Sequence, residues 1–415
     1  MNADRSLRIV LAAVGSRGDV QPMLALAQTL RACGHVPVIA APPNVESWVR
    51  HLGFEFAPLG VDIQQWLAEH SDVLTGNPVT MLKGASQYLN AQLAEQAREL
   101  VPICAGADAL VYAGLALAAP TVADFLHLPT LGVLYTTCML PSGRHPPISI
   151  PWHGLPQWIN RLLWRANSLI NDSIGLESLN TVRASLNLPA IKHIRHHLLE
   201  DHPLVVAADE TVFPSDPRWQ VLYPYANFLF FDDPAPLDAE LDAWLADGEP
   251  PVFVGFGSMS GKGTQRIERL IVEAVCATGK RCIVGAGWAG LGSGALPGGW
   301  RMVRDAPHAL LFPRMAVVIH HGGSGTTAQT LRAGVPQVLL PLILDQFHHA
   351  HRLYLAGISP RPVPMEKITA AELTCAIQAA LQLPPGPRQA AATRLRQSDG
   401  RGDIVRRIEA MAYAA

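Results

Sequence analysis

Several features that mark other classes of protein are missing from this sequence of 415 residues. Its six cysteines include no C-x-x-C pair, which argues against a zinc site or a disulfide framework and favours a reducing compartment. The N-terminal apolar run, Ile9 to Val14, is too short for a signal peptide. No stretch reaches the roughly 18 uninterrupted apolar residues that a membrane-spanning helix needs. We therefore expect a cytoplasmic protein.

Charge is also scarce, with 16% charged residues and a formal net charge of −2. No basic field is present that would attract nucleic acid, so we expect no nucleic-acid partner. The 49% of hydrophobic residues are enough for more than one core, and the length favours two domains of roughly 200 residues each.

The first forty residues predict an α/β fold. Arg8 to Val14 is a β-branched apolar run, typical of a strand buried on both faces. The loop Gly15 to Asp19 follows, then a helix that starts near Pro22 and ends at Gly34. Pro37 to Ala41 predicts the next strand, which completes a right-handed βαβ unit with a parallel sheet.

The same order of strand, loop, helix and strand begins again near Pro251. It follows a proline- and aspartate-rich stretch that is typical of a linker. We therefore predict two Rossmann-like doubly wound domains that face each other across a cleft. Residues 1–235 form the N-terminal domain, which would bind an acceptor, and residues 236–395 the C-terminal domain. A final helix in residues 396–415 is expected to pack back on the N-terminal domain.

The most informative segment runs from Ala316 to Pro336. A strand (Ala316 to Ile319) leads through Gly322, Gly323 and Gly325 into a helix (Thr326 to Ala333). Such a helix N-terminus is suited to an anion, because free backbone N–H groups and the positive end of the helix dipole point at it. Hydroxyl and imidazole donors lie close by in the sequence, at Ser324, Thr326, Thr327 and His321. The segment predicts a diphosphate site.

A glycine-rich turn alone is weak evidence, because it often marks only tight helix–strand packing. The segment does not match G-x-x-x-x-G-K-[ST], which disfavours an ATP-hydrolysing P-loop. It also lacks the placement of the dinucleotide-binding G-x-G-x-x-G. Asp345 and Gln346 follow the next strand, Val338 to Pro341, where a carboxylate and a carboxamide can bind vicinal sugar hydroxyls.

Together these motifs resemble the donor signature of nucleotide-sugar-dependent glycosyltransferases with the two-domain GT-B fold, most of all the bacterial natural-product and sterol glucosyltransferase branch. The resemblance rests on His320-His-Gly-Gly-Ser-Gly-Thr-Thr, Gly334-Val-Pro and Asp345-Gln346. It extends to Val254-Gly-Phe-Gly-Ser-Met, Gly287-Trp-Ala-Gly-Leu, Ala306-Pro-His-Ala-Leu-Leu-Phe-Pro and Gly15-Ser-Arg-Gly-Asp-Val-Gln-Pro. It is weakest from Pro141 to Phe230.

The resemblance implies a set of donor-binding residues, with the diphosphate near His321, the ribose near Gln329, the base near Pro307 and the sugar near Asp345. The set comprises Ser258, Trp288, Pro307, His308, His321, Gly323, Ser324, Gly325, Thr326, Gln329, Asp345 and Gln346. A UDP- or TDP-sugar is the implied co-substrate, with UDP-glucose as the first choice. No cofactor or metal is expected, and the sequence has no Asp-x-Asp motif.

Asp19 is the candidate general base, because it follows the first strand on the opposite wall of the predicted cleft. Relatives often have a histidine in this loop, whereas this loop contains none. A base at this place would contribute about 10²–10⁴-fold. The alternative is that Asp19 only caps the helix near Pro22, since aspartate is a preferred cap.

The stretch from Pro141 to Leu199 is the least regular part. Trp152 and Trp158 are candidates for lining an acceptor pocket, and the alternative is that the aromatic segments simply cover the sheet. The basic, aromatic segment from Pro156 to Arg165 could also contact a membrane peripherally. His193, His196, His197 and His202 lack a carboxylate at ligand spacing, which disfavours a metal site.

The resulting hypothesis is an inverting glycosyltransferase that moves a hexose from the nucleotide sugar to a hydroxyl of a lipophilic small molecule, with Asp19 as base. The same fold also hosts nucleotide-sugar epimerases, which need no acceptor. A catalytically silent protein that binds nucleotide sugars is a third interpretation.

Overall fold

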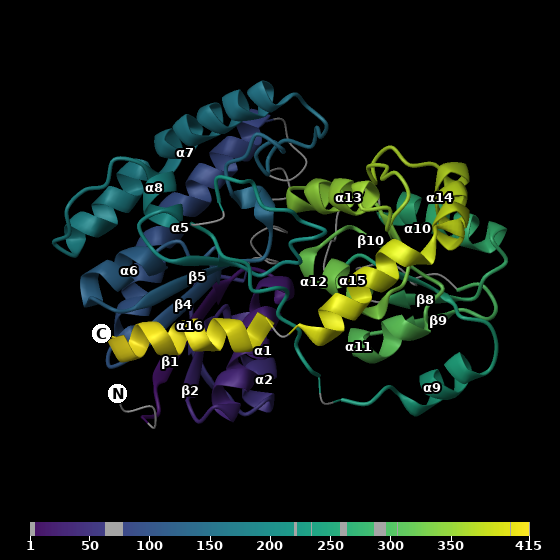
Figure 1. The fold of residues 1–415 in the computed structure, drawn as a ribbon, viewed down its shortest axis with the longest axis horizontal. Helices are drawn as coiled ribbons and strands as arrows, with labels where there is room; N and C mark the ends of the chain where they lie inside the picture. Colours follow the sequence, from purple (N-terminus) through teal and green to yellow (C-terminus); the bar gives the residue numbers. More distant parts are fainter. Residues whose placement is uncertain are drawn as a thin grey trace.

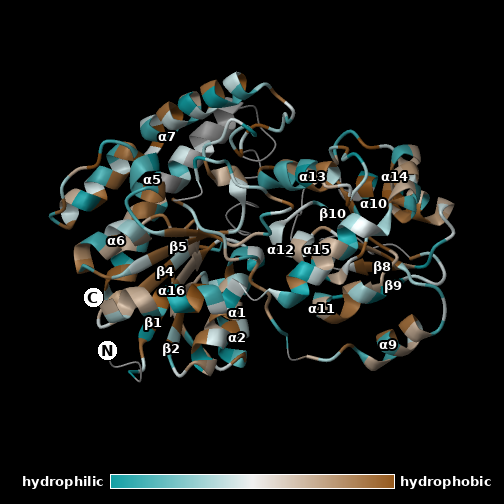
Figure 2. Cartoon of the chain, in the orientation of Figure 1, coloured by the Kyte–Doolittle hydropathy of each residue, from teal (hydrophilic) through white to brown (hydrophobic). Residues whose placement is uncertain are grey.

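The computed structural model of the chain describes residues 5–62, 78–219, 222–233, 235–257, 264–285, 296–304, 306–398 and 400–414. Two α/β bodies lie side by side, each built around its own parallel sheet (Figure 1). The strands are the most apolar elements of both bodies (Figure 2). This two-domain, parallel-sheet architecture confirms the fold class predicted from the sequence.

The N-terminal sheet has the strand order β3-β2-β1-β4-β5-β6, with every pair parallel. Its strands are β1 (Arg8–Val14), β2 (Val36–Ala41), β3 (Glu55–Pro58), β4 (Ala109–Gly114), β5 (Thr130–Leu134) and β6 (Leu204–Val206). Strand order reverses between β1 and β4, so their carboxyl ends form the topological switch point where ligands of such sheets bind.

Helices cover both faces of this sheet. They are α1 (Arg17–Ala32), α2 (Glu46–His51), α5 (Pro78–Cys104), α6 (Ala119–Leu126), α7 (Gln157–Ser185) and α8 (Ile194–Leu199), with short 3-10 turns at Pro43–Val45 and Thr137–Met139. The segment that the sequence left least regular therefore contains one 29-residue helix, α7. α7 packs on α5 and forms an outer layer of the domain (Figure 1).

The second sheet has the order β11-β10-β7-β8-β9, again all parallel. Its strands are β7 (Val252–Gly255), β8 (Cys282–Gly285), β9 (Arg301–Val303), β10 (Val317–His320) and β11 (Gln337–Leu339). Its helices are α9 (Ala239–Ala246), α10 (Thr264–Ala277), α11 (His308–Leu311), α12 (Ser324–Ala333), α13 (Asp345–Leu355), α14 (Ala370–Gln382) and α15 (Pro385–Gln397), with a 3-10 turn at Phe312–Arg314. The switch point lies between β7 and β10.

The start of α1 differs from the sequence prediction. The helix begins at Arg17, not near Pro22, and Ser16 is its N-cap. Ser16 and Asp19 form a capping box, which satisfies N–H groups at the helix start and so brings the start forward. Pro22 consequently lies inside the helix, where its missing N–H removes one intrahelical bond.

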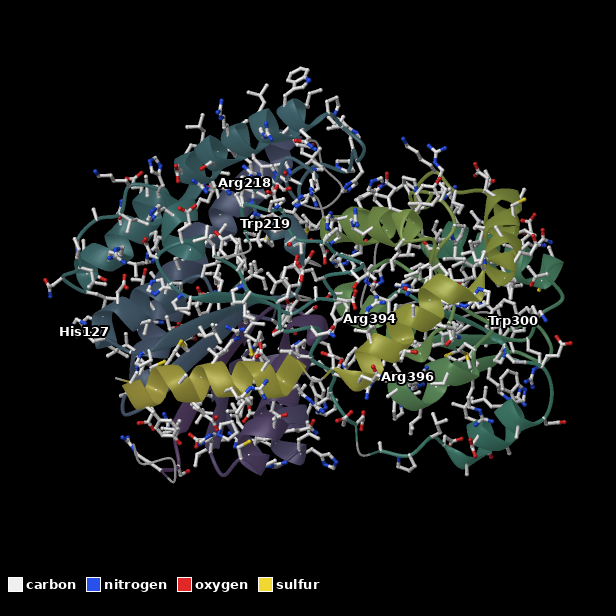
Figure 3. The ribbon with its side chains drawn as sticks, viewed as in Figure 1. His127, Arg218, Trp219, Trp300, Arg394 and Arg396 are labelled. Carbon is white, nitrogen blue, oxygen red and sulfur yellow. The ribbon has the colours of Figure 1, made fainter. Side chains whose placement is uncertain are left out.

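The two domains share an apolar cluster in addition to their separate cores. Phe213 and Trp219 of the N-terminal part pack there with Leu331, Leu353 and other residues of the second domain. Arg394 on α15, at the junction of the domains in Figure 3, forms an ion pair with the buried Asp209 at 3.4 Å. These contacts hold the carboxyl ends of the two sheets in a defined relation.

The last helix, α16 (Gly400–Ala414), crosses back to the first domain and packs against α1 (Figure 1). Ile404, Val405 and Ile408 enter the core of that domain. At its start, a Cβ on Gly400 would lie 2.1 Å from the carbonyl oxygen of Ala226 and 2.6 Å from that of Asn227. Only glycine therefore permits this close approach of α16 to the backbone of residues 226–228.

Gly400→Ala is accordingly expected to lower the free energy of unfolding by about 1–3 kcal/mol, because backbone must move to admit the methyl group. Urea denaturation measures this. Gly386→Ala in α15 is the matched control, since a Cβ there meets nothing within 4 Å. Its stability should be unchanged or slightly higher, and equal stability of the two variants would contradict this packing.

Candidate active site

Asp19 lies in the first turn of α1, directly above the carboxyl ends of β1 and β4. A Cβ on Gly15 would lie 2.2 Å from Asp19 Oδ2, and one on Gly114 would lie 3.1 Å from Oδ1. The two glycines thus make room for the carboxylate at the switch point of the N-terminal sheet. The Ser16 backbone N–H donates to Asp19 Oδ2 at 2.8 Å, and Ser16 Oγ donates to the same oxygen at 3.1 Å.

The capping alternative for Asp19 is therefore realised, although with Ser16 as the N-cap and a helix that starts at Arg17. Capping does not exclude a role as base. Both hydrogen bonds from Ser16 are accepted by Oδ2, so Ser16 leaves Oδ1 able to accept a proton. Burial and, to a smaller extent, the charge of Asp345 raise the pKa of Asp19, and the hydrogen bonds from Ser16 lower it; the net result is a pKa of about 6. A carboxylate with this pKa is a better base than an isolated aspartate.

The N-terminus of α12 provides the opposite wall. Gly323 is its N-cap and the helix starts at Ser324, two residues before the predicted start. The first N–H groups of a helix have no intrahelical acceptor, so those of Ser324, Gly325 and Thr326 point out of the helix end. At the other end of α12, Arg396 donates to the carbonyl oxygens of Arg332 and Ala333 at 3.0 Å each (Figure 3).

His321 lies at the carboxyl end of β10, over the end of β7. A Cβ on Gly257 would be 3.6 Å from His321 Cε1, and one on Gly323 would be 2.7 Å from Nε2. Burial lowers the pKa of His321 to about 4, so the ring is neutral at pH 7. Its Nδ1 is buried and has no hydrogen-bond partner in the described part of the chain. The ring is thus placed beside the helix end, with one nitrogen unsatisfied.

Ser324 makes a contact that the sequence did not suggest. Its hydroxyl, expected to face a diphosphate, donates to the carbonyl oxygen of Tyr135 at 3.0 Å. The hydroxyl of Tyr135 in turn donates to the carbonyl oxygen of Asp19 at 3.0 Å. Tyr135 therefore joins the candidate base to the start of α12, and only the backbone N–H of Ser324 is left to face an anion.

A second contact between the two domains is made by His349, which is buried in α13. His349 Nδ1 donates to the Gly322 carbonyl oxygen at 2.7 Å, and His349 Nε2 lies 3.0 Å from Thr136 Oγ1 of the first domain. The Gly322 carbonyl can only accept, so Nδ1 carries a proton, and Nε2 is left to pair with the threonine hydroxyl. His349 Nδ1 also lies 3.7 Å from Asp345 Oδ2.

Asp345 and Gln346 are the first two residues of α13 but differ in burial and in hydrogen-bond partners. Asp345 is half-buried, and burial raises its pKa while nearby His349 lowers it. Gln346 is buried, and its Oε1 accepts from the backbone N–H groups of Leu342 at 2.8 Å and Ile343 at 3.1 Å. The carboxamide oxygen of Gln346 thus holds the preceding loop, and a sugar contact by either residue stays a prediction.

The other predicted donor residues are distributed as follows. Gln329 is on α12, and its Oε1 is buried without a partner among the described residues. The Pro307 carbonyl accepts from Leu310 and Leu311, and the His308 ring stacks on Phe312 with ring centroids 4.2 Å apart. Ribose and base contacts at these positions stay predictions. Ser258 and Trp288 lie outside the described residues.

Both acceptor candidates are exposed side chains. Trp152 is 63% exposed and Trp158 66% exposed, whereas Trp164 is buried and donates to the His145 carbonyl oxygen at 3.0 Å. Trp164 therefore covers the core, as the alternative interpretation held, and the two exposed tryptophans lie on the outer surface of the domain.

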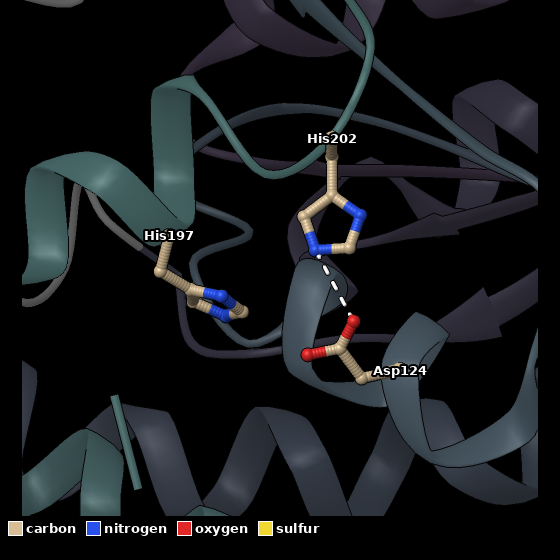
Figure 4. Close-up of side chains that lie close together, drawn as sticks. All are labelled: Asp124, His197 and His202. Atoms are coloured by element: carbon tan, nitrogen blue, oxygen red, sulfur yellow. Dashed lines mark ion pairs between the residues drawn. The ribbon is translucent and has the colours of Figure 1, made fainter. Parts of the chain in front are cut away.

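One sequence-based statement about the histidine patch is wrong. A carboxylate does accompany it, because α6 brings Asp124 to His202, with Oδ1 3.4 Å from Nε2 and near His197 (Figure 4). Asp124 Oδ2 accepts from Arg183 at 2.6 Å, and His197 Nε2 lies 3.0 Å from Thr121 Oγ1. We therefore interpret this cluster as an internal polar network, in which Arg183 pairs with Asp124 and Thr121 with His197.

Two facing doubly wound domains, with a carboxylate at one switch point and an open helix N-terminus at the other, define the GT-B class of glycosyltransferase. Glycosyltransferase VinC, solved in complex with DTDP, shares this fold with a TM-score of 0.69 and 19% identity, covering 99% of this chain and 100% of its own. Residues 9–127 match the glycosyltransferase family 28 N-terminal domain, and residues 273–402 match the erythromycin biosynthesis protein CIII-like C-terminal domain.

Glycosyltransferase GtfE of Amycolatopsis orientalis is 33% identical over 89% of this chain and 90% of its own length. The chain therefore belongs to the glycosyltransferase family that includes GtfE. A sterol 3-beta-glucosyltransferase of Arabidopsis thaliana, UGT80B1, is 30% identical over 91% of this chain. The chain spans 63% of the length of that plant relative.

Proposed function

We propose that this glycosyltransferase moves a hexose from a UDP- or TDP-sugar to a hydroxyl group of a lipophilic small molecule, with inversion at the anomeric carbon. The observation that carries the proposal is Asp19, a half-buried carboxylate with a raised pKa, joined through Tyr135 to the start of α12. A relative named for sterol glucosyl transfer supports a lipophilic acceptor, and one named for glucosyl transfer to the vancomycin aglycone supports a small-molecule acceptor.

In this mechanism Asp19 accepts the proton of the acceptor hydroxyl as its oxygen attacks the anomeric carbon. The bond from that carbon to the diphosphate oxygen breaks in the same displacement. The growing charge on the diphosphate faces the N–H groups of Gly325 and Thr326 and the positive end of α12. His321 adds a neutral donor, and Asp345 holds sugar hydroxyls. These protein groups offset the charge of the leaving group, so no metal step is included.

The test is a transfer assay with UDP- and TDP-hexoses against sterol, macrolide and polyphenol acceptors, read by the gain of one hexosyl mass. The proposal expects a product that requires both substrates. Thermal stabilisation by the nucleotide sugars, measured separately, ranks the donors because ligand binding raises apparent stability. Donors that stabilise the protein but give no hexosylated product with any acceptor class would contradict the acceptor proposal.

The pH profile provides a second test. Because the base must be ionised and the pKa of Asp19 is raised to about 6, kcat/KM should fall as the pH drops through about 6. Ser16→Ala removes a hydrogen bond that lowers this pKa, so the acid limb should move to higher pH. Thr369→Ala disrupts the capping box of α14, far from the site, and should leave the limb unchanged. A limb near pH 4 in the unaltered enzyme would refute the assignment.

A further inference from the structure

One side of α7 presents large apolar side chains that are exposed to solvent. Trp158, Leu162 and Leu169 are 66%, 57% and 70% exposed. Their spacing of four and seven residues puts them on one side of the helix. Trp152, 63% exposed, lies just before the helix. Scattered exposed apolar residues are ordinary, but a row of this kind marks an interaction surface.

The two charged side chains of α7 between Trp158 and Leu169 are both positive. Arg161 and Arg165 are exposed beside it, and Arg161 bonds only the neutral Gln157, at 3.2 Å, among the interactions of the described chain. Residues 125–171 contain no aspartate or glutamate. The first acid of α7, Asp172, is occupied by the His193 ring and the Ile194 N–H, both at 2.9 Å. The surface is therefore apolar and positive.

We propose that this surface, called the α7 face and made of Trp152, Trp158, Arg161, Leu162, Arg165 and Leu169, docks on an anionic phospholipid bilayer. Tryptophan rings favour the interface between headgroups and acyl chains, and arginines are attracted by anionic lipids. A second copy of the chain fits less well, because a two-fold contact would bring the arginines of two α7 faces together. In the described residues, no helix has the length and apolar character to cross the bilayer.

This proposal goes beyond glycosyl transfer itself and does not depend on which acceptor is used. A bilayer contact would hold the N-terminal domain where lipophilic molecules partition. The contact would therefore matter for acceptors that partition into the bilayer. A soluble acceptor should be turned over equally well whether or not the α7 face is altered.

The test is sedimentation of the purified full chain with vesicles of phosphatidylcholine alone or mixed with phosphatidylglycerol. The unaltered protein should bind the mixed vesicles more tightly. The double variant Leu162→Ser/Leu169→Ser should bind at least about tenfold more weakly, with unchanged turnover of a soluble acceptor. The double variant Arg161→Gln/Arg165→Gln should lose about 25-fold, fivefold for each arginine, on mixed vesicles only.

Leu355→Ser is the matched control, because Leu355 is 56% exposed on the other domain. Melting curves verify that each variant is folded. Three results would each overturn the proposal: no vesicle binding by the unaltered protein, equal loss of binding in Leu355→Ser, or self-association that the leucine variants abolish without any vesicle binding.

Discussion

Asp19→Asn is expected to lower kcat by about 10²–10⁴-fold while the affinity for the donor changes little. Asparagine retains an oxygen that can accept from Ser16, so the capping box and the start of α1 are preserved. What is lost is the negative oxygen that takes the acceptor's proton. Steady-state kinetics, together with donor titration by calorimetry, separate the two effects.

Stability provides the control for this variant. The folded-state pKa of Asp19, about 6, lies above its ordinary value of 3.8, so the ionised carboxylate destabilises the folded protein. Stability is therefore lost as the pH rises from about 4 to 6, and the neutral asparagine should be at least as stable as aspartate at pH 7. A variant that is fully folded and turns over at near the original rate would remove Asp19 from the mechanism.

Gly325→Asp is expected to weaken nucleoside diphosphate binding about a hundredfold or more. Gly325 is exposed in the first turn of α12, and a Cβ there meets nothing within 4 Å. The new carboxylate is favourable for the helix itself, since it faces the positive dipole end. It would occupy and repel the diphosphate, and one charge about 5 Å away costs about 3 kcal/mol at an effective dielectric constant of about 20.

Gly325→Asn is the matched control, with the same shape and no charge. Calorimetric titration with UDP and TDP should show a much smaller loss for asparagine than for aspartate. Equal binding by the two variants would mean that the diphosphate does not lie at the start of α12. This pair therefore tests the donor site independently of catalysis.

The sequence was informative wherever function depends on local chemistry. The strand Arg8–Val14 was predicted with its observed bounds, because continuous β-branched runs define buried parallel strands. The glycines before α12 likewise revealed an open helix N-terminus. The start of α1 was misplaced, because Pro22 was weighted above the Ser16 and Asp19 capping pair.

The contacts that assemble the site could not be predicted from the sequence, because they join residues that are far apart in the chain. His349 and Thr136 are separated by 213 positions, and Ser324 and Tyr135 by 189. Tyr135 gave a weak signal, as a polar aromatic residue directly after the strand β5, and His349 gave another, in the same helix as Asp345. The burial of Gln346 and the exposure of Trp158 depend on packing between elements, which one-dimensional periodicity does not report.

The most direct test of the account is the anomeric configuration of the hexosylated product, measured by proton NMR alongside release of the nucleoside diphosphate. A single displacement assisted by Asp19 predicts inversion relative to the donor and release only when acceptor is present. Retention of configuration would contradict the single displacement. Conversion of the donor to an epimeric nucleotide sugar without any acceptor would show that the cleft between the domains performs a different reaction.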